Sequence, residues 1–270
     1  MKNLSRVRHV VLDMDGTLYR GARLFAPTLP FLERLRRLAI GYTFLTNNTS
    51  RGKAEYVSKL HAFGIEADEN QICTPVESVI AYLRQALPQV KTVAVLGTPS
   101  LCREFTEAGF QVNWEAPDAV VAGFDLTLTY ERLCRAAYWI SAGLPFLATH
   151  PDLVCPTEEP TVLVDCGSLC ACLTAATGRK PKVFGKPHPS ILSDLGQRLA
   201  LAPVEMLMAG DRIYTDIRMA QDAGVVAVLV LTGEAKPEDA AALANPPDLI
   251  VADVGELGDA LERARRPVER

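Results

Sequence analysis

Short apolar runs that alternate with helical segments constrain the fold of this chain more than any other feature. The first apolar run is His9–Leu12, and the next is Tyr42–Thr46. Helical segments follow them at 27–40, which we expect Gly41 to end, and at 51–63. Strands that are apolar throughout are typical of parallel sheets with helices on both faces, so this order predicts right-handed strand–helix–strand units. We therefore expect an α/β fold with a parallel sheet flanked by helices.

The same alternation continues through the rest of the chain in two further series. The second series has strands and helices at 92–96, 99–108, 119–122, 130–142 and 146–148. From Lys182 we expect the first series to resume, with strands at 183–184, 206–209, 225–231 and 249–252 and helices that end at 201, 223 and 265. The interruption is long enough to form a small domain of its own. The predicted organisation is a discontinuous core, 1–80 and 181–270, with a smaller α/β domain inserted at 81–180.

Polar side chains gather where several predicted strands end. The set comprises Asp13, Asp15, Thr46, Asn47, Asn48, Lys186, Asp211 and Asp216. Each residue has an ordinary structural explanation when it is taken alone, such as a strand-end turn, a helix cap or a solvated lysine. Ligands of open α/β sheets bind beyond the carboxyl ends of the strands, so the residues together indicate a binding site. We expect all of them at one edge of one sheet.

The composition excludes several classes of protein. A net charge of -4 and a pI near 5.7 give no basic excess for binding a nucleic acid polymer or an anionic membrane. The residues before His9 are polar and basic, and the apolar run that follows is too short for a signal-peptide core or a membrane span. We therefore expect a cytoplasmic protein with no nucleic acid or membrane partner.

Four motifs give the polar residues a family context. They read Asp-Met-Asp-Gly-Thr-Leu-Tyr at 13–19, Leu-Thr-Asn-Asn-Thr-Ser at 45–50, Gly-Lys-Pro-His-Pro at 185–189 and Gly-Asp-Arg-Ile-Tyr-Thr-Asp-Ile at 210–217. With these motifs in this order, the chain resembles phosphatases of the haloacid dehalogenase (HAD) superfamily. It is most similar to the branch that holds NagD-type nucleotide phosphatases and the phosphatases of p-nitrophenyl phosphate, phosphoglycolate and pyridoxal phosphate. The resemblance spans nearly the whole chain and implies a Rossmann-like HAD core with an inserted cap domain.

The resemblance also implies a role for each polar residue. Asp13 would be the nucleophile that forms an aspartyl-phosphate, and Asp15 would protonate the leaving group and later take a proton from water. Mg²⁺ would bind Asp13, the backbone carbonyl of Asp15 and Asp211, while Asp216 would hold a metal-bound water. The residues expected to neutralise and hold the phosphoryl group are Lys186, Thr46, Asn47 and Asn48.

The expected activity is hydrolysis of a small phosphorylated metabolite, such as a sugar phosphate, a nucleoside monophosphate, phosphoglycolate or pyridoxal phosphate. Two alternatives stay open at this point. A phosphomutase or phosphotransferase would use the same aspartyl-phosphate, and a catalytically silent ligand-binding protein would keep the fold. In the family the cap contacts the leaving group, and a homodimer through the cap is a further expectation.

The segment 149–166 is the expected contact region for the leaving group, because it follows a cap strand where the family places its specificity loop. We expect a loop over 150–160 in this segment. Its candidate side chains are His150, Asp152, Glu158, Glu159 and Asp165. Relatives often carry a Pro-Gly-x-Gly-Ser-like stretch here, whereas this chain reads Val-Asp-Cys-Gly-Ser at 164–168. The resemblance therefore does not assign a named substrate.

Overall fold

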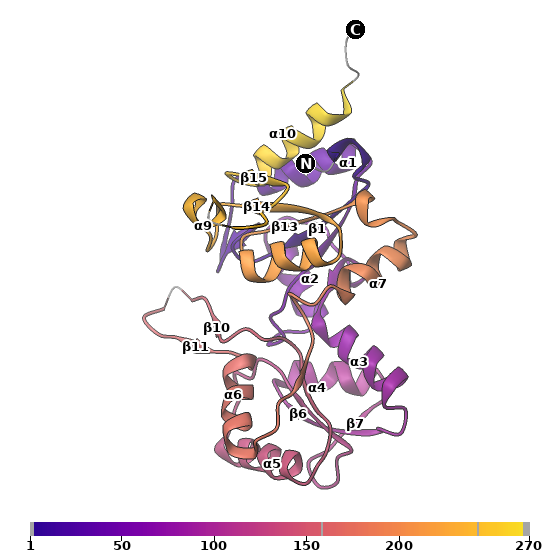
Figure 1. Cartoon of the computed structure of the whole chain (residues 1–270), viewed down its shortest axis with the longest axis vertical. Coiled ribbons are helices and arrows are strands. Elements are labelled where there is room, and N and C mark those ends of the chain that lie inside the picture. The colour runs from indigo at the N-terminus through magenta and orange to yellow at the C-terminus, as the bar shows by residue number, and fades with distance from the viewer. Residues whose placement is uncertain (1–2, 158, 242, 267–270) are drawn as a thin grey trace. The chain divides into compact units, whose positions relative to one another are not determined.

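The chain folds into two compact units, each with its own sheet and core. A computed structural model describes residues 3–157, 159–241 and 243–266 (Figure 1). The first unit comprises Met1–Thr46, Val57–Cys73 and Pro187–Arg270, and the second comprises Asn47–Tyr56 and Thr74–Lys186. Over the described ranges, no helix is both long enough and apolar enough to cross a bilayer.

The first unit is built on a six-stranded parallel sheet in the order β15-β14-β13-β1-β4-β5. Its strands are β1 (His9–Asp13), β4 (Gly41–Leu45), β5 (Ile72–Cys73), β13 (Met206–Gly210), β14 (Val226–Val230) and β15 (Leu249–Val251). Every residue of β1, β13 and β14 is buried, as expected for apolar strands in the middle of a parallel sheet. A short antiparallel hairpin of β2 (Tyr19–Arg20) and β3 (Arg23–Leu24) follows β1.

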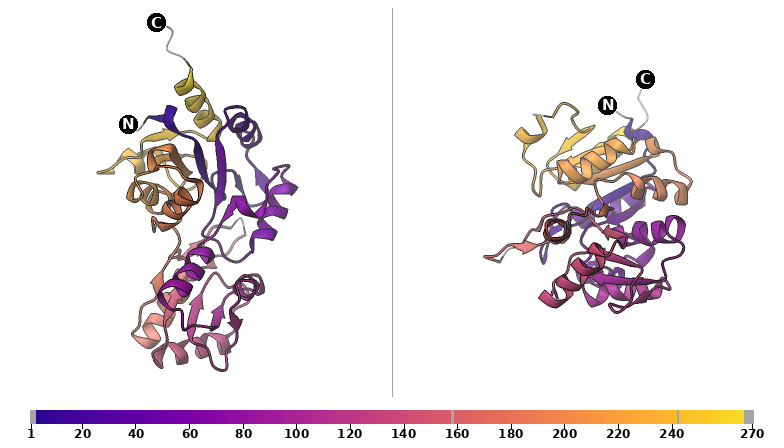
Figure 2. Two further views of the ribbon diagram at one scale, coloured as in Figure 1. Left: turned by 90° about the vertical axis from the view of Figure 1, so that its right-hand side faces the viewer. Right: turned by 60° about the horizontal axis from the view of Figure 1, so that its bottom comes forward.

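Helices lie on either side of this sheet (Figure 2). They are α1 (Thr28–Arg37), α7 (Ser190–Leu199), α8 (Arg218–Asp222), α9 (Pro237–Ala241) and α10 (Val254–Arg265), and α2 (Lys53–Ala62) runs across the boundary between the two units. Leucine and methionine side chains of α7 and α8 pack on the sheet face that carries Val11, Met208 and Leu229. Helices α1 and α10 pack against each other. The sheet is therefore the middle layer of an α/β unit.

The second unit repeats the design with a five-stranded parallel sheet in the order β12-β9-β8-β6-β7. Its elements are α3 (Pro75–Ala86), β6 (Thr92–Leu96), α4 (Pro99–Glu107), β7 (Gln111–Val112), β8 (Ala119–Ala122), α5 (Tyr130–Ser141), β9 (Phe146–Ala148), β10 (Val154–Cys155), β11 (Leu163–Val164), α6 (Cys166–Thr177) and β12 (Lys182–Val183). Helices α3 and α4 cover one face of the sheet, and α5 and α6 cover the other. The fold class expected from the sequence is therefore confirmed.

One strand lies in a different sheet from the one predicted. We expected the run at 183–184 to resume the first series, but β12 pairs in parallel with β9, with Lys182 opposite Leu147 and Val183 opposite Ala148. The prediction that all polar clusters follow strands of one sheet is therefore wrong for Lys186, which comes after β12. A strand of two residues has too little pattern to reveal its neighbour, so tertiary pairing alone decides its sheet.

The structure differs in detail from three local predictions. The helix expected over 27–40 ends at Arg37, and Ala39 turns the chain with a positive φ of 53° while Gly41 begins β4. The helix before residue 223 starts as a π-helix, Ile213–Ile217, and continues as α8. The loop expected over 150–160 contains β10, which forms a hairpin with β11.

Candidate active site

Three neighbouring strands bring the predicted acidic and hydroxyl residues to one edge of the six-stranded sheet. Strand β1 lies between β13 and β4, with Leu12 opposite Ala209 and Asp13 opposite Leu45. The residue after β4 is Thr46, and the residue after β13 is Asp211. The expected strand-end positions of Asp13, Thr46 and Asp211 are therefore confirmed, because parallel strands end at the same edge.

Asp13, Asp211 and Asp216 form a buried acidic cluster. One carboxylate oxygen from each lies within 4.8 Å of the others. The three residues are 7%, 3% and 0% exposed, respectively. Thr17 donates a hydrogen bond from its hydroxyl to Asp13 Oδ2 at 3.2 Å and so orients that carboxylate. Thr17 lies within the first motif but was not among the residues predicted for the site.

Glycines give the acidic cluster the space it needs. A Cβ atom on Gly16 would lie 2.5 Å from Asp211 Oδ2, and one on Gly233 would lie 1.8 Å from the same oxygen. At the end of β13, a Cβ atom on Gly210 would lie 2.3 Å from Asp216 Cγ. Real Cβ atoms do not approach so closely, so larger residues at these positions would displace the two carboxylates. Gly16 also has a positive φ of 92°, which favours glycine independently.

The electrostatics of the cluster suit a bound cation. Burial, together with the charges of Asp13 and Asp216, raises the pKa of Asp211 to about 8. Asp211 Oδ2 accepts a hydrogen bond from the amide of Glu234 at 2.8 Å, whereas its buried Oδ1 has no hydrogen-bond partner among the described residues. Neighbouring buried carboxylates repel one another unless positive charge is added, and hard oxygen ligands are those that Mg²⁺ prefers. The residues present therefore fit a divalent metal ion.

Asp15 lies beside this cluster in a more accessible position. Partial burial raises the pKa of Asp15 above its ordinary value, the Lys59 ammonium opposes that rise, and Asp13 adds to it. A raised pKa suits a carboxyl group that gives and takes protons. Lys59 also lies over the ring of Tyr19, with Nζ 3.9 Å from the ring centroid. No sequence pattern points to Lys59, because it occupies an ordinary position on a helix.

Lys186 and Asn47 belong to the second unit and are joined by hydrogen bonds. The Lys186 amide donates to Asn47 Oδ1 at 2.8 Å, and Asn47 Nδ2 donates to the Lys186 carbonyl at 3.0 Å. Asn47 Nδ2 also approaches the carboxylate oxygens of Asp152 at 3.2 and 3.3 Å. Asn47 is 5% exposed and Lys186 is 4% exposed. The side-chain carboxamide of Asn47 therefore makes its hydrogen bonds with other groups of the protein.

Thr46 and Asn48 flank Asn47 in the second motif. Thr46 is 8% exposed, and its amide donates to the carbonyl of Cys73 at 3.2 Å. Asn48 Oδ1 accepts from the amide and the hydroxyl of Ser50 at 2.9 and 2.7 Å, which closes a local turn. The carbonyl of Asn48 accepts the Tyr56 hydroxyl at 2.8 Å. The side chain of Asn48 thus supports the shape of this loop.

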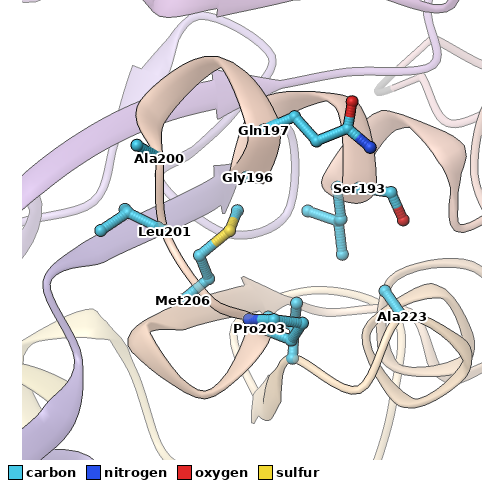
Figure 3. A pocket seen from close by; sticks show the side chains of 10 residues that line it. Ser193, Gly196, Gln197, Ala200, Leu201, Pro203, Met206 and Ala223 are labelled. Atoms are coloured by element: carbon cyan, nitrogen blue, oxygen red, sulfur yellow. The ribbon is translucent and has the colours of Figure 1, made fainter.

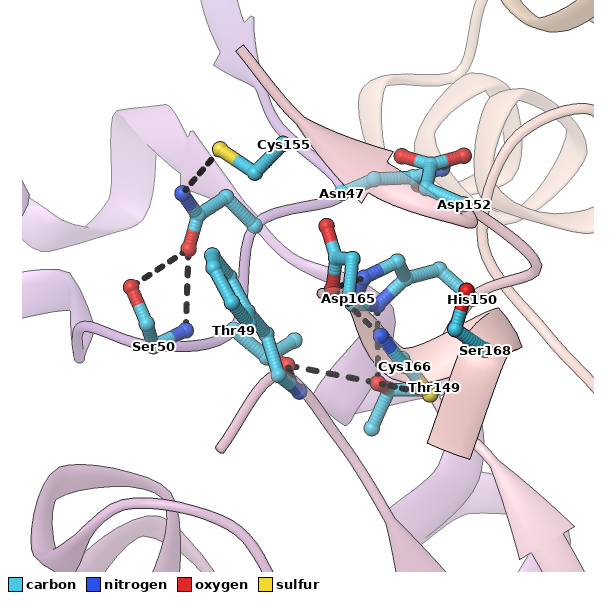
Figure 4. Close-up of polar contacts among 12 residues, drawn as sticks. Asn47, Thr49, Ser50, Thr149, His150, Asp152, Cys155, Asp165, Cys166 and Ser168 are labelled. Atoms are coloured by element: carbon cyan, nitrogen blue, oxygen red, sulfur yellow. Dashed lines mark hydrogen bonds and ion pairs between the residues drawn. The ribbon is translucent and has the colours of Figure 1, made fainter. Parts of the chain in front are cut away.

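The segment 149–166 contains a second group of titratable side chains, His150, Asp152 and Asp165 (Figure 4). His150 Nε2 lies 2.8 Å from Asp165 Oδ1, and its Nδ1 lies 2.8 Å from the Thr149 hydroxyl. Burial alone would lower the pKa of His150, but the Cys166 sulfur and the carboxylates of Asp165 and Asp152 raise it to about 9. Glu158, another candidate in this segment, lies outside the described residues, and Glu159 is exposed.

A cavity of about 340 Å³ in the first unit is separate from the acidic cluster (Figure 3). Its lining includes Leu192, Gln197 and Met206 and none of the predicted site residues. Met206 is the first residue of β13, whereas Asp211 follows the last. The cavity is therefore at the opposite end of that strand and does not belong to the site.

Comparisons of the sequence with known proteins agree with this geometry. Residues 10–111 match the haloacid dehalogenase-like hydrolase family, and residues 183–257 match a HAD-hydrolase-like family. The 5′-nucleotidase YutF of Bacillus subtilis is 33% identical over 228 residues, which cover 84% of this chain and 88% of that protein. An acid sugar phosphatase of Staphylococcus aureus is 30% identical over 261 residues, 96% of this chain and 100% of that protein.

Solved structures of similar proteins share the complete fold. A 4-nitrophenylphosphatase from Thermotoga maritima has a TM-score of 0.91 and 38% identity, and the match covers 97% of this chain and 100% of that one. A glycerol phosphate phosphatase from Mycobacterium tuberculosis in complex with magnesium has a TM-score of 0.87 and 31% identity, over 95% of this chain and 78% of that one. The chain therefore belongs to the haloacid dehalogenase-like hydrolase family and is a phosphatase of that family.

Proposed function

We propose that the chain is a Mg²⁺-dependent phosphatase that hydrolyses a small phosphorylated metabolite through an aspartyl-phosphate on Asp13. The observation that carries the proposal is the buried acidic cluster of Asp13, Asp211 and Asp216, in which Asp211 Oδ1 has no hydrogen-bond partner among the described residues. A nucleotidase and a sugar phosphatase among the relatives support a sugar phosphate or a nucleoside monophosphate as the substrate class.

Asp13, Asp211 and the backbone carbonyl of Asp15 would hold the metal ion, and Asp216 would hold a water in its coordination shell. When bound, Mg²⁺ would supply positive charge against the repulsion between a carboxylate and a phosphate dianion, which is about 4 kcal/mol per charge pair at about 4 Å in an effective dielectric of about 20. The magnesium in the glycerol phosphate phosphatase structure supports this choice of ion.

The remaining steps use the side chains of the chain itself. One carboxylate oxygen of Asp13 would bond to phosphorus while the bond from phosphorus to the leaving oxygen breaks. Asp15 would give its proton to that oxygen, and then remove a proton from the water that splits the aspartyl-phosphate. Thr17, which donates to Asp13 Oδ2, would orient the nucleophile. Lys186 and Thr46 would hold phosphoryl oxygens through the ammonium and the hydroxyl group.

We assign substrate choice to the inserted cap, 81–180, and phosphoryl transfer to the core, 1–80 and 181–270. The compact units support a division of this kind, although residues 47–56, 74–80 and 181–186 belong to the second unit. The segment 149–166 is the proposed contact region for the leaving group. The proposed homodimer through the cap would be tested by light scattering on the purified protein.

The decisive experiment is a phosphate-release screen over sugar phosphates, nucleoside monophosphates, phosphoglycolate, pyridoxal phosphate and an aryl phosphate, with and without Mg²⁺. We expect release of inorganic phosphate that depends on Mg²⁺ and is lost in Asp13→Asn. An isomerised sugar phosphate without phosphate release would instead identify a mutase. No turnover of any compound, with binding retained, would identify a silent ligand-binding protein.

A further inference from the structure

Asn47 holds the backbone of Lys186 at two points. Its Oδ1 accepts from the Lys186 amide at 2.8 Å, and its Nδ2 donates to the Lys186 carbonyl at 3.0 Å. A carboxamide that binds both the N–H and the C=O of one residue fixes the place of its Cα and the plane of its flanking peptides. Both groups are almost wholly buried, so water does not compete for these bonds.

Asp152 fixes the orientation of that carboxamide. Its two oxygens lie 3.2 and 3.3 Å from Asn47 Nδ2, which therefore faces two acceptors, the carboxylate and the Lys186 carbonyl. If the amide were turned over, its nitrogen would face the Lys186 N–H, and its oxygen would face the Asp152 carboxylate. Only the observed orientation satisfies all the groups.

The residue before Lys186, Gly185, has to be a glycine for the backbone to lie this close to Asn47. Gly185 has a positive φ of 71°, and a Cβ atom there would lie 2.8 Å from Asn47 Oδ1, 2.8 Å from the Thr149 carbonyl and 3.0 Å from His150 Cβ. The Gly185–Lys186 backbone is thus packed between Asn47 on one side and the end of β9 on the other. A larger residue at Gly185 would push Lys186 away from its position.

A hydrogen bond holds the backbone of Asp152 in place. The amide of Gly167 donates to the Asp152 carbonyl at 2.8 Å, and a Cβ atom on Gly167 would lie 2.1 Å from the Pro151 carbonyl. One residue before Pro151, buried His150 pairs with Asp165. The two ring nitrogens of His150 already contact Asp165 and Thr149, so neither nitrogen is available as a metal ligand.

We propose that Asn47 is a positioning residue for Lys186, with Asp152 as its orienting partner, instead of a ligand of the phosphoryl group. This inference rests on the proposed role of Lys186 in phosphoryl transfer. It assigns Asn47 and Asp152 a shared task, although they are far apart in the sequence. Asn47 acts on the reaction only through Lys186, so its removal matters only while the lysine is present.

A double-mutant cycle tests this dependence. We expect Asn47→Ala to lower kcat/KM for the best substrate at least about tenfold, mainly through kcat, and Lys186→Met to lower it at least about 100-fold. In the double variant, kcat/KM should match that of Lys186→Met within about threefold, because Asn47 acts only through the lysine. Effects that multiply instead would show that Asn47 contacts the phosphoryl group directly and would overturn the proposal.

Variants of Asp152 extend the test to its partner. Asp152→Ala should lower kcat, and Asp152→Asn should stay within about threefold of the wild type, because an amide oxygen can still accept from Asn47. Asn113, an exposed residue of the second unit whose Oδ1 accepts the amide of Glu115, provides a matched control. Asn113→Ala should retain the kcat of the wild type. An Asp152→Ala variant with unchanged kcat would remove Asp152 from the proposal.

Hydrogen exchange separates this inference from the proposed function. The Lys186 amide should exchange at least about tenfold faster in Asn47→Ala than in wild type or Asn113→Ala, since its acceptor is lost. This result does not depend on turnover, so it holds even if the screen finds no substrate. Unchanged protection of that amide in a folded Asn47→Ala variant would contradict the proposed positioning.

Discussion

The carboxylate of Asp211 occupies the space that a side chain on Gly16 would need, since a Cβ atom there would lie 2.5 Å from Asp211 Oδ2. The two residues are far apart in the sequence, yet the position of the Asp211 carboxylate depends on the absence of a side chain at Gly16. The turn that follows β1 therefore has to be narrow for the acidic cluster to form. This contact makes the shape of the first motif testable separately from its charges.

Gly16→Ala should abolish most of the phosphatase activity. The added methyl group would displace Asp211 and weaken metal binding, so we expect kcat/KM to fall at least about 100-fold with saturating Mg²⁺. Gly64 is a matched control, because it also has a positive φ, 77°, but nothing lies within 4 Å of its Cβ position. Gly64→Ala should lose about 1 kcal/mol of stability and keep its activity. Equal activity in the two variants would show that the contact with Asp211 has no catalytic importance.

Asp13→Asn should eliminate turnover while leaving the fold intact. The amide has nearly the same shape and can still accept from Thr17, but it cannot form an aspartyl-phosphate. Phosphate release measured with the best substrate should fall to the background rate, and the circular dichroism spectrum should match that of the wild type. Full activity in this variant would refute the nucleophile assignment.

Asp15→Asn should separate the two halves of the reaction. A nitrophenolate leaves without a proton, so phosphorylation of Asp13 by an aryl phosphate should persist while hydrolysis of the aspartyl-phosphate slows by about 10²–10⁴-fold. Rapid mixing with 4-nitrophenyl phosphate should then give a burst of nitrophenolate followed by a slow steady state. Unchanged steady-state hydrolysis would show that Asp15 has no acid–base role.

Removal of metal should make the stability of the protein depend on pH through Asp211. Its pKa is raised to about 8 in the folded protein against an ordinary value of 3.8, so the folded state binds more protons between these values. Stability in EDTA should therefore fall as the pH rises from about 4 to about 8. Urea unfolding across this range should show the decline, and Asp211→Asn should reduce it. Added Mg²⁺ should restore stability at pH 8, and a flat profile in EDTA would contradict the shift.

His150 should contribute to stability with its own pH dependence. Its pKa is raised to about 9 from an ordinary value of 6.5, so its contribution is fully present below pH 6.5 and is lost as the pH passes about 9. His150→Gln should be destabilised relative to the wild type at pH 6, with the difference becoming smaller toward pH 10. The unfolding free energies measured at constant ionic strength would reveal this convergence. A constant difference across the range would show that packing alone explains the role of His150.

The parts of the site that could be predicted from sequence follow long apolar strands. Asp13 and Asp211 come directly after runs of buried residues, and parallel strands that lie side by side end at one edge. Lys186 could not be placed in this way, because only Lys182 and Val183 form the strand before it. The strand before Lys186 joins its sheet by pairing with β9, and no local sequence pattern predicts that pairing.

Side-chain partnerships were beyond the reach of the sequence for a different reason. The motif identified Asn47 as important, but its hydrogen bonds to Asp152 and Lys186 depend on three segments that meet only in the folded chain. The π-helix at Ile213–Ile217 likewise has no signature in propensity, since its five residues would also suit an ordinary helix. The sequence therefore predicted the strand-end positions of these residues better than it predicted their side-chain contacts.

The central place of β1 has a consequence for protein synthesis. The strand that carries Asp13 emerges early from the ribosome, but its neighbour β13 is made long afterwards. A nascent chain that stops before Asp211 has the proposed nucleophile without the two carboxylates that would complete the proposed metal site. Such a translation intermediate would lack the proposed metal site, so we expect phosphatase activity only once most of the chain has been translated.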